Sequence, residues 1–190
     1  LRRSLAVKAF AHTRDYDTAI HSFLARGTMT MSAVTDELPD QLSLGMQKLE
    51  ELRYGENAHQ KAAYYSREVG AGPLDGTLVG GNKQLSYNNI LDLDASWRTV
   101  SGFSDATVVI VKHLTPTGIA SAETIAEAFP NALASDPVSA FGGVIAVNRP
   151  VDESFVEALG TLFVEAIVAP GFSDEAQTRL EGKRKNCRLL

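Results

Sequence analysis

The feature that most restricts the fold of this chain is the run Thr-Val-Val-Ile-Val at residues 107–111. All five residues are β-branched, which favours an extended strand. The run lacks the alternation of apolar and polar residues that a half-exposed strand shows, so we expect both faces of this strand to be buried. Strands of this kind occur where helices cover a parallel or mixed sheet, and the run therefore predicts an α/β protein.

The rest of the chain alternates between strand-like and helix-like patterns, which indicates helices packed on a sheet. Further strands are expected at residues 62–66, 144–147 and 162–170. Helices are expected at residues 4–26, after the N-cap pair Asn88-Asn89, at 121–134 from Ser121, from the cap Asp152 to about 161, and after the cap Ser173. We predict a mixed sheet with packed helices.

The segment 27–46 separates the first predicted helix from the remaining pattern. It has no clear hydrophobic period and contains Pro39, so we expect a linker or an extended crossing segment with a domain boundary near residues 27–45. The chain begins at Leu1 rather than at a methionine, and it ends on a strand-like run at 187–190. Both ends suggest an excerpt from a longer protein.

Composition excludes several classes of protein. The net charge is −5, and basic residues gather near the two ends, at 1–26 and 181–190, so the middle of the chain is strongly acidic. This is a poor surface for general nucleic-acid binding. A single cysteine excludes a disulfide framework and a cysteine-rich zinc module. With neither a membrane-length apolar stretch nor a signal peptide, we expect a cytoplasmic protein without a membrane partner.

The best-placed candidates for chemistry are Lys112 and His113, which directly follow the run at 107–111. Ligands of open α/β sheets bind outside the carboxyl ends of strands. There His113 could accept a proton and Lys112 could stabilise negative charge on an oxygen. The alternative from spacing alone is a surface lysine beside a structural histidine.

Three other segments are weaker candidates. Residues 136–143, Asp-Pro-Val-Ser-Ala-Phe-Gly-Gly, allow a ligand to approach the backbone, although the glycines alone favour a plain turn before a strand. Arg53 with Tyr54 could hold a phosphate, although such pairs are common on surfaces. The basic run 183–185 is by default a solvated helix end. The remaining histidines show no metal-ligand pattern, and we predict no metal site.

Taken together and in order, six blocks resemble one family. The blocks are LRYGENAHQ, LSYNNILDLDASW, VIVKHLTPTGIA, SDPVSAFGGVIAVNRPVD, FVEAIVAPGFSDEA and KRKNCRLL. They are similar to the PurH-type bifunctional purine biosynthesis family, whose members join an IMP cyclohydrolase domain to an aminoimidazole carboxamide ribonucleotide (AICAR) formyltransferase domain. The resemblance covers nearly the whole chain with its spacings intact.

The resemblance implies a domain plan. Residues 1–27 would be the closing helix of the cyclohydrolase domain, 28–45 a linker, and 46–190 the first of two cytidine-deaminase-like subdomains of the transferase domain. The family lacks the deaminase zinc, so no catalytic metal is implied, although a monovalent cation is allowed. The family also implies a homodimer whose active site is completed by the second transferase half.

The resemblance also implies substrates and residue roles. The reaction transfers a formyl group from the cosubstrate 10-formyltetrahydrofolate to the 5-amino group of AICAR, and the full-length protein also closes the product to IMP. His113 matches the catalytic base and Lys112 its transition-state-stabilising neighbour. The positions that match nucleotide-binding residues are Arg53, Tyr54, Phe141, Gly142, Glu165 and Lys185.

Several positions depart from the family pattern. Thr115 and Thr117 stand where the catalytic loop usually has Asn and Cys, Ala58 replaces a usual Pro, and Ser135 stands where Cys is frequent. Pro130 is expected to interrupt a helix. The two threonines favour altered hydrogen bonding in the catalytic loop, and the other changes favour divergence or reduced activity. An alternative function is therefore a non-catalytic nucleotide-binding or dimerisation module derived from the family.

Overall fold

The structure is a computed structural model that describes residues 1–25, 45–66, 74 and 76–190. The chain divides into two units, Leu1–Gln47 and Lys48–Leu190. The predicted linker falls almost wholly outside the described residues.

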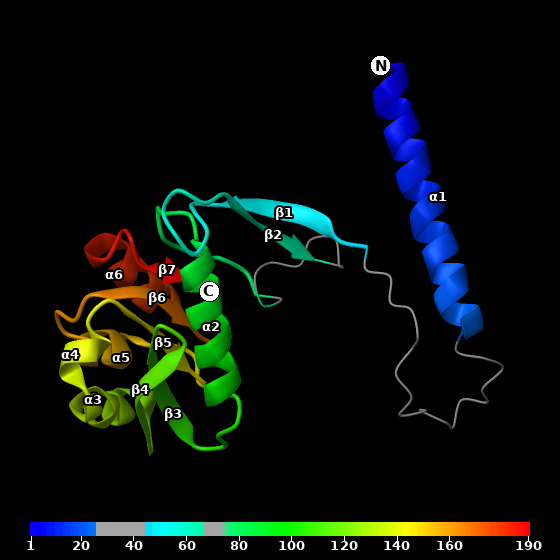
Figure 1. The fold of residues 1–190 in the computed structure, drawn as a ribbon. Coiled ribbons are helices and arrows are strands. Elements are labelled where there is room, and N and C mark those ends of the chain that lie inside the picture. The colour runs from blue at the N-terminus through cyan, green and yellow to red at the C-terminus, as the bar shows by residue number, and fades with distance from the viewer. Residues whose placement is uncertain (26–44, 67–73, 75) are drawn as a thin grey trace. The chain divides into compact units, whose positions relative to one another are not determined.

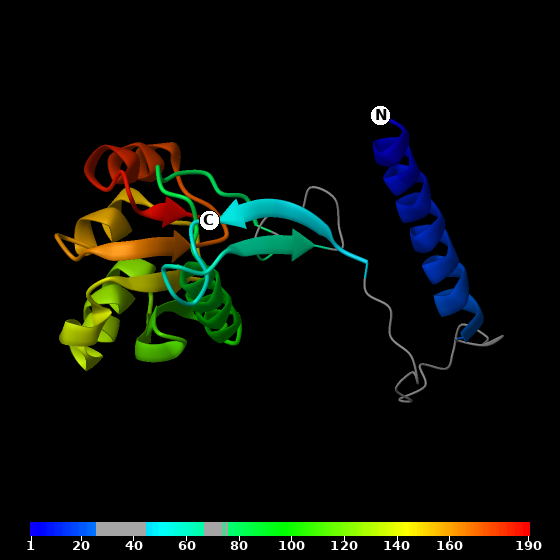
Figure 2. The same cartoon turned by 45° about the horizontal axis from the view of Figure 1, so that its top comes forward.

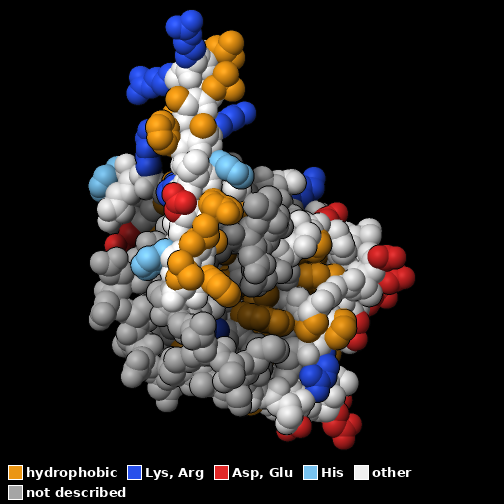
Figure 3. Space-filling view, turned by 90° about the vertical axis from the view of Figure 1, so that its right-hand side faces the viewer, with side chains coloured by type: hydrophobic (Ala, Val, Ile, Leu, Met, Phe, Trp, Pro, Cys, Tyr) orange, Lys and Arg blue, Asp and Glu red, His pale blue; other side chains and the backbone are white. Residues whose placement is uncertain are grey.

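The first unit contains one long helix, α1 (Arg2–Ala25), where a helix at 4–26 was expected. Large apolar side chains on α1, among them Phe10, Tyr16 and Phe23, are more than 60% exposed. They lie along the helix together with several basic side chains, as Figure 3 shows. The helix α1 therefore carries large apolar side chains that are exposed.

The second unit is built on a mixed five-stranded sheet with the strand order β4-β3-β5-β6-β7 (Figures 1 and 2). Its strands are β3 (Ala106–Lys112), β4 (Thr115–Ala122), β5 (Gly143–Val147), β6 (Val164–Val168) and β7 (Arg188–Leu189). β3 runs antiparallel to both β4 and β5, whereas β5, β6 and β7 are parallel. A separate two-stranded sheet pairs β1 (Gln47–Leu52) with β2 (Ala62–Ser66).

Helices cover both faces of the five-stranded sheet. α2 (Tyr87–Val100) packs against β3, β5 and β6 on one face. α3 (Ile125–Ser135), α5 (Glu153–Ala158) and α6 (Asp174–Lys183) lie on the other face, and the short α4 (Pro137–Ala140) precedes β5.

The central strand β3 supplies side chains to the cores on both faces. Val109 and Val111 join the core under α2, and Val108 and Ile110 join the core under α3. The predicted α/β class, the mixed sheet and the burial of the run at 107–111 on both faces are therefore confirmed.

Helix caps decide where several elements begin. Asp152 and Ser173 cap α5 and α6 as predicted, because each side chain accepts a backbone N–H of the first turn. The predicted cap of α2 at Asn88-Asn89 is wrong. Ser86 is the N-cap, and it forms a reciprocal capping box with Asn89, which occupies the third helical position.

The prediction of a helix from Ser121 is wrong for its first residues. The segment 115–122 is strand β4, and α3 starts only after its N-cap Thr124. Pro130 does not interrupt α3, which runs continuously to Ser135 with Pro130 exposed on its outer side. α5 ends at Ala158 rather than near 161, β6 is shorter than the expected strand, and β1 was not predicted.

Candidate active site

Lys112 and His113 lie at a tight turn between β3 and β4. Lys112 pairs with Thr115, so the turn has two central residues, His113 and Leu114. Both have positive φ, 53° and 66°, as in a type I′ hairpin turn. Gly, Asn and Asp are the usual residues there, because the left-handed conformation costs other residues roughly 1–2 kcal/mol each. The exposed imidazole of His113 is therefore presented on a strained turn.

Hydrogen bonds from outside the turn hold this conformation. The backbone N–H of Leu114 donates to Oδ1 of Asp92, in the second turn of α2, at 2.7 Å. Thr115 donates its hydroxyl to the carbonyl of His113 at 3.4 Å. The hydroxyl of Thr117 donates to the carbonyl of Ile110 at 3.3 Å. Both threonines that depart from the family pattern thus take part in the hydrogen bonding of this hairpin.

Lys112 is fixed by the segment before β5. Its ammonium donates to the carbonyl of Phe141 at 2.7 Å. Asp136, the N-cap of α4, is close enough to interact with the same charge. Hydrogen bonds from Ser139 lower the pKa of the Asp136 carboxyl, with a smaller contribution from the charge of Lys112. The lysine therefore has a defined position beside the turn at 113–114.

Phe141 and Gly142 form the bend that leads into β5. Gly142 has a φ of 73°, which a residue with a side chain rarely adopts. Its N–H donates to the carbonyl of Phe163 at 2.8 Å, and the rings of Phe141 and Phe163 are 5.4 Å apart. Phe141 is 58% exposed and Phe163 41% exposed, so two partly exposed aromatic rings lie next to the carbonyl that Lys112 contacts.

Arg53 and Tyr54 lie beside the N-terminus of α2. The N–H of Arg53 donates to the carbonyl of Leu85 at 3.0 Å, and the N–H of Tyr87 donates to the carbonyl of Tyr54 at 3.1 Å. The Arg53 guanidinium is 5.1 Å from the centre of the Tyr54 ring. This cation–π contact leaves the guanidinium exposed and able to meet an anion.

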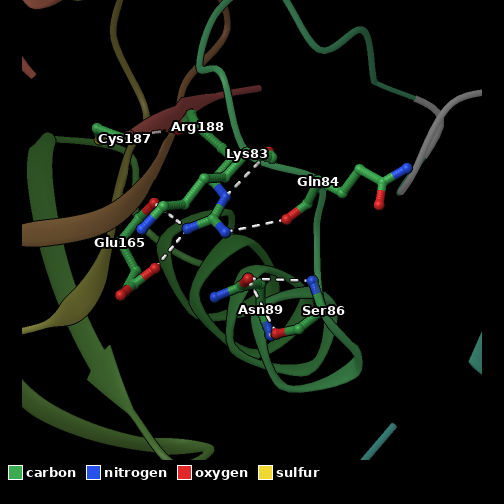
Figure 4. Close-up of polar contacts among 7 residues, drawn as sticks. All are labelled: Lys83, Gln84, Ser86, Asn89, Glu165, Cys187 and Arg188. Carbon is green, nitrogen blue, oxygen red and sulfur yellow. Dashed lines mark hydrogen bonds and ion pairs between the residues drawn. The ribbon is translucent and has the colours of Figure 1, made fainter. Parts of the chain in front are cut away.

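Glu165 contacts a buried arginine that the sequence analysis did not single out. Arg188 is 1% exposed, and its guanidinium pairs with the Glu165 carboxylate (Figure 4). It also donates to the carbonyls of Glu165, Lys83 and Gln84. The only sequence signal for this role is an arginine inside the otherwise apolar run at 187–190.

The basic run 183–185 is not uniformly solvated. Arg184 donates to the carbonyls of Leu162 and Gly160, so the structure uses it to hold the loop before β6. Lys185 is exposed and lines a pocket of about 250 Å³ together with Gly80, Gly81, Asn82 and Glu181. Its ammonium is therefore placed at a concave surface beside the glycine turn at 80–81.

The predicted site residues gather at one end of the five-stranded sheet. Val111 pairs with Val144, Gly143 with Val164, and Ala166 with Arg188. The carboxyl end of β3 therefore lies beside the amino ends of β5, β6 and β7. The rule for open parallel sheets led us to the carboxyl end of β3. That end lies opposite to the carboxyl ends of the parallel strands β5, β6 and β7, because β3 runs antiparallel to them.

The comparison with known protein families gives a match over the whole chain. Residues 1–190 match the family described as "AICARFT/IMPCHase bienzyme". The chain belongs to this bienzyme family. Its relatives include the bifunctional purine biosynthesis proteins PurH of Desulfitobacterium hafniense, Halalkalibacterium halodurans and Leuconostoc citreum, which are 46%, 45% and 44% identical to it. All of this chain is covered, but only 37%, 36% and 35% of the respective relatives.

Family membership connects the chain to purine biosynthesis, whereas the roles of single residues stay predictions. The chain spans little more than a third of the length of these relatives. Within it, three of the blocks quoted in the sequence analysis, 52–60, 85–97 and 109–120, contain the loop at Arg53, most of helix α2 and the turn at His113. These three elements are connected by the hydrogen bonds described above.

Three further observations concern metal binding, thiol chemistry and membrane spans. Among the described residues, no group of three or more His, Cys, Asp or Glu side chains is arranged to hold a metal ion. Burial raises the pKa of the Cys187 thiol to about 12, so it stays protonated near neutral pH and is a poor nucleophile. None of the helices in the described ranges is long and apolar enough to span a membrane.

Proposed function

We propose that this chain carries the catalytic lysine–histidine pair of an AICAR formyltransferase, within a protein that also closes the formylated product to IMP. The observation that carries the proposal is the convergence of Lys112 and His113 with Gly142, Glu165 and Lys185 at one end of the sheet. Family membership supports the same reaction.

The chemistry requires a base, because the 5-amino group of AICAR is a weak nucleophile whose lone pair is delocalised into the ring and carboxamide. Its nitrogen attacks the formyl carbon of 10-formyltetrahydrofolate, and the new C–N bond forms as the bond to N10 breaks. His113 accepts the proton that the amine loses and returns it to N10 as N10 leaves, so the proton count of the step is balanced. The ammonium of Lys112 stabilises the negative charge that develops on the formyl oxygen.

The remaining predicted residues serve nucleotide binding. Arg53 and Lys185 are exposed cations suited to the phosphate of AICAR. Phe141 and Gly142 offer backbone and ring contacts to the nucleotide. The side chain of Glu165 remains 34% exposed although it pairs with Arg188, so its carboxylate can also meet a ligand.

The wider proposals follow from the family. The segment 46–190 would be the first cytidine-deaminase-like subdomain of the transferase, and residues 1–27 the last helix of the cyclohydrolase. The full-length protein would be a cytoplasmic homodimer that uses AICAR and a folate cosubstrate. A second transferase half would complete the active site.

The proposal is tested with two single variants of the full-length protein. His113→Ala should lower kcat for formyl transfer by about 100-fold or more, because general-base catalysis contributes that much. Its affinity for AICAR, measured by calorimetric titration, should hardly change. Arg53→Ala should show the opposite pattern, with AICAR affinity weakened by about tenfold through loss of a charged contact.

The same measurements separate the proposal from its alternative. Near-normal turnover of His113→Ala would remove this residue as the base. If the unaltered full-length protein binds AICAR but transfers no formyl group from 10-formyltetrahydrofolate, the chain is part of a non-catalytic nucleotide-binding module.

A further inference from the structure

The turn that presents His113 is formed by residues that do not favour it. The described residues contain three non-glycine residues with positive φ, and two of them, His113 and Leu114, are the central residues of this turn. Leu114 has no polar side-chain atom that could hydrogen-bond to its own backbone and so support the left-handed conformation. Some contact from outside the turn must therefore hold it in place.

That contact comes from α2. Oδ1 of Asp92 accepts the N–H of Leu114 at 2.7 Å, which is a short, charge-assisted hydrogen bond. α2 is itself fixed at its start by the capping box between Ser86 and Asn89, and it packs on β3 and β5. None of the ion pairs in the described part of the chain involves Asp92, so its carboxylate is available to the turn.

We infer that Asp92 is a positioning residue for the reaction, acting through the N–H of Leu114 to keep the strained turn in the conformation that presents His113. The inference rests on the proposed role of His113. Asp92 touches no reacting atom in this scheme. Its contribution is to limit the orientations of the imidazole, and misplacement of a catalytic group by about 1 Å can lower a rate by roughly 100-fold.

The neighbouring carboxylate Asp94 provides a matched control. It lies on the same helix two residues further on, and it pairs with Arg98 at 2.7 Å rather than with the turn. Removing Asp94 therefore changes the charge of α2 by the same amount without touching residues 113–114. A general effect of helix charge would appear in both variants, whereas loss of the turn contact appears only in Asp92→Ala.

Leu114 itself provides a test of the mechanism. Glycine adopts positive φ at no steric cost, so Leu114→Gly should let the turn form without the support of Asp92. The double variant Asp92→Ala/Leu114→Gly should therefore recover activity that Asp92→Ala has lost. Asp92→Asn keeps an oxygen acceptor at the same place and should retain most of the activity.

The experiment uses the full-length protein, with steady-state kinetics at varied AICAR and hydrogen exchange of the peptide that contains the turn. Asp92→Ala should lower kcat by about 10- to 100-fold with KM for AICAR within about twofold, and exchange in the turn should become faster. Asp94→Ala should resemble the unaltered protein, Asp92→Asn should retain most of the kcat, and Leu114→Gly should restore most of the kcat in the Asp92→Ala background.

Three results would overturn the inference: unchanged kcat and exchange in Asp92→Ala, an equal loss in Asp94→Ala, or no recovery on adding Leu114→Gly. The outcome is separable from that of the proposed function. If His113→Ala is inactive while Asp92→Ala is normal, only the positioning role fails. If His113→Ala is active, the catalytic assignment fails, and faster exchange in Asp92→Ala would still show that Asp92 holds the turn.

Discussion

At the scale of single residues, Arg188 is the most unusual, because its charged side chain is almost completely buried. A guanidinium can be buried only where acceptors surround it, because an unpaired buried charge is very unfavourable. Here the acceptors are the Glu165 carboxylate and the carbonyls of Glu165, Lys83 and Gln84. Arg188 thus connects β6 and β7 to the segment that leads into the cap of α2, as Figure 4 shows.

Arg188→Met should therefore be strongly destabilising. The variant keeps the apolar stem but leaves three carbonyls and one carboxylate without their partner, which should cost about 3 kcal/mol of the free energy of unfolding. Urea denaturation followed by circular dichroism measures the loss. Arg179→Met is the matched control, since Arg179 contacts Glu153 and Glu157 at the surface and its loss should matter much less. Equal losses in the two variants would contradict this account.

The sequence predicted the roles of single residues correctly where those roles depend only on neighbouring residues in the chain. A helix cap needs only a short polar side chain ahead of an apolar pattern, and Asp152 and Ser173 supplied it. Arg188 could not be found in this way, because its partners lie 23 and more than 100 positions away in the sequence. The same holds for Asp92, whose contact with Leu114 spans 22 positions.

At the scale of elements, the hairpin of β3 and β4 depends on a glycine. A Cβ built on Gly118 would lie 1.9 Å from the carbonyl oxygen of Ala132 in α3, which no side chain can tolerate without moving the backbone. Gly118 is therefore what allows α3 to pack so closely against β4. Because β4 also forms one side of the turn at 113–114, a displacement of β4 is transmitted directly to His113.

Two alanine substitutions should have opposite effects on stability. Gly118→Ala should lower the free energy of unfolding by several kcal/mol, because backbone in the helix or the strand must shift. Gly182→Ala should raise it by roughly 0.5–1 kcal/mol, because a Cβ there meets nothing within 4 Å and alanine is the better helix former in α6. Thermal denaturation of the two variants compares them. A tolerated Gly118→Ala would show that α3 and β4 are not in rigid contact.

The sequence predicts one strand of this hairpin, β3, much more clearly than the other, β4. β3 is a run of buried β-branched residues, whereas β4 contains Pro116 and Gly118, which normally argue against a strand. The register of β3 and β4 explains why β4 can contain both Pro116 and Gly118. Val111 pairs with Pro116 and Ile110 with Gly118, so Thr117 is an extra residue that forms a β-bulge in β4. Because β4 is an outer strand, Pro116, which has no N–H, costs the sheet no hydrogen bond.

At the scale of the whole molecule, the stabilising core lies in the second unit. Every fully buried apolar residue in the described ranges falls between Leu85 and Leu190. These residues form two clusters, one on each face of the five-stranded sheet. α1, in contrast, buries none of its large apolar side chains within the part of the chain that the structure describes.

Residues 45–190 should consequently fold without the preceding residues. The shortened chain is expected to unfold cooperatively in urea, with nearly the same midpoint as the 190-residue chain. A second truncation that also ends at residue 186 removes Cys187, Arg188, Leu189 and Leu190, all of which are buried, and should lose the cooperative transition. If residues 45–190 fail to unfold cooperatively, the core described here is not self-sufficient.

The arrangement of the outer strands has a consequence for self-association. A sheet recruits a strand from another molecule through unpaired N–H and C=O groups along its margin. On one margin Pro116 offers no N–H and the bulge at Thr117 disturbs the spacing. On the other margin Val79 and Gly80 already occupy the hydrogen-bonding groups of Leu189. Both margins of the five-stranded sheet are thus poorly suited to fibril-like growth by the addition of a strand from another molecule.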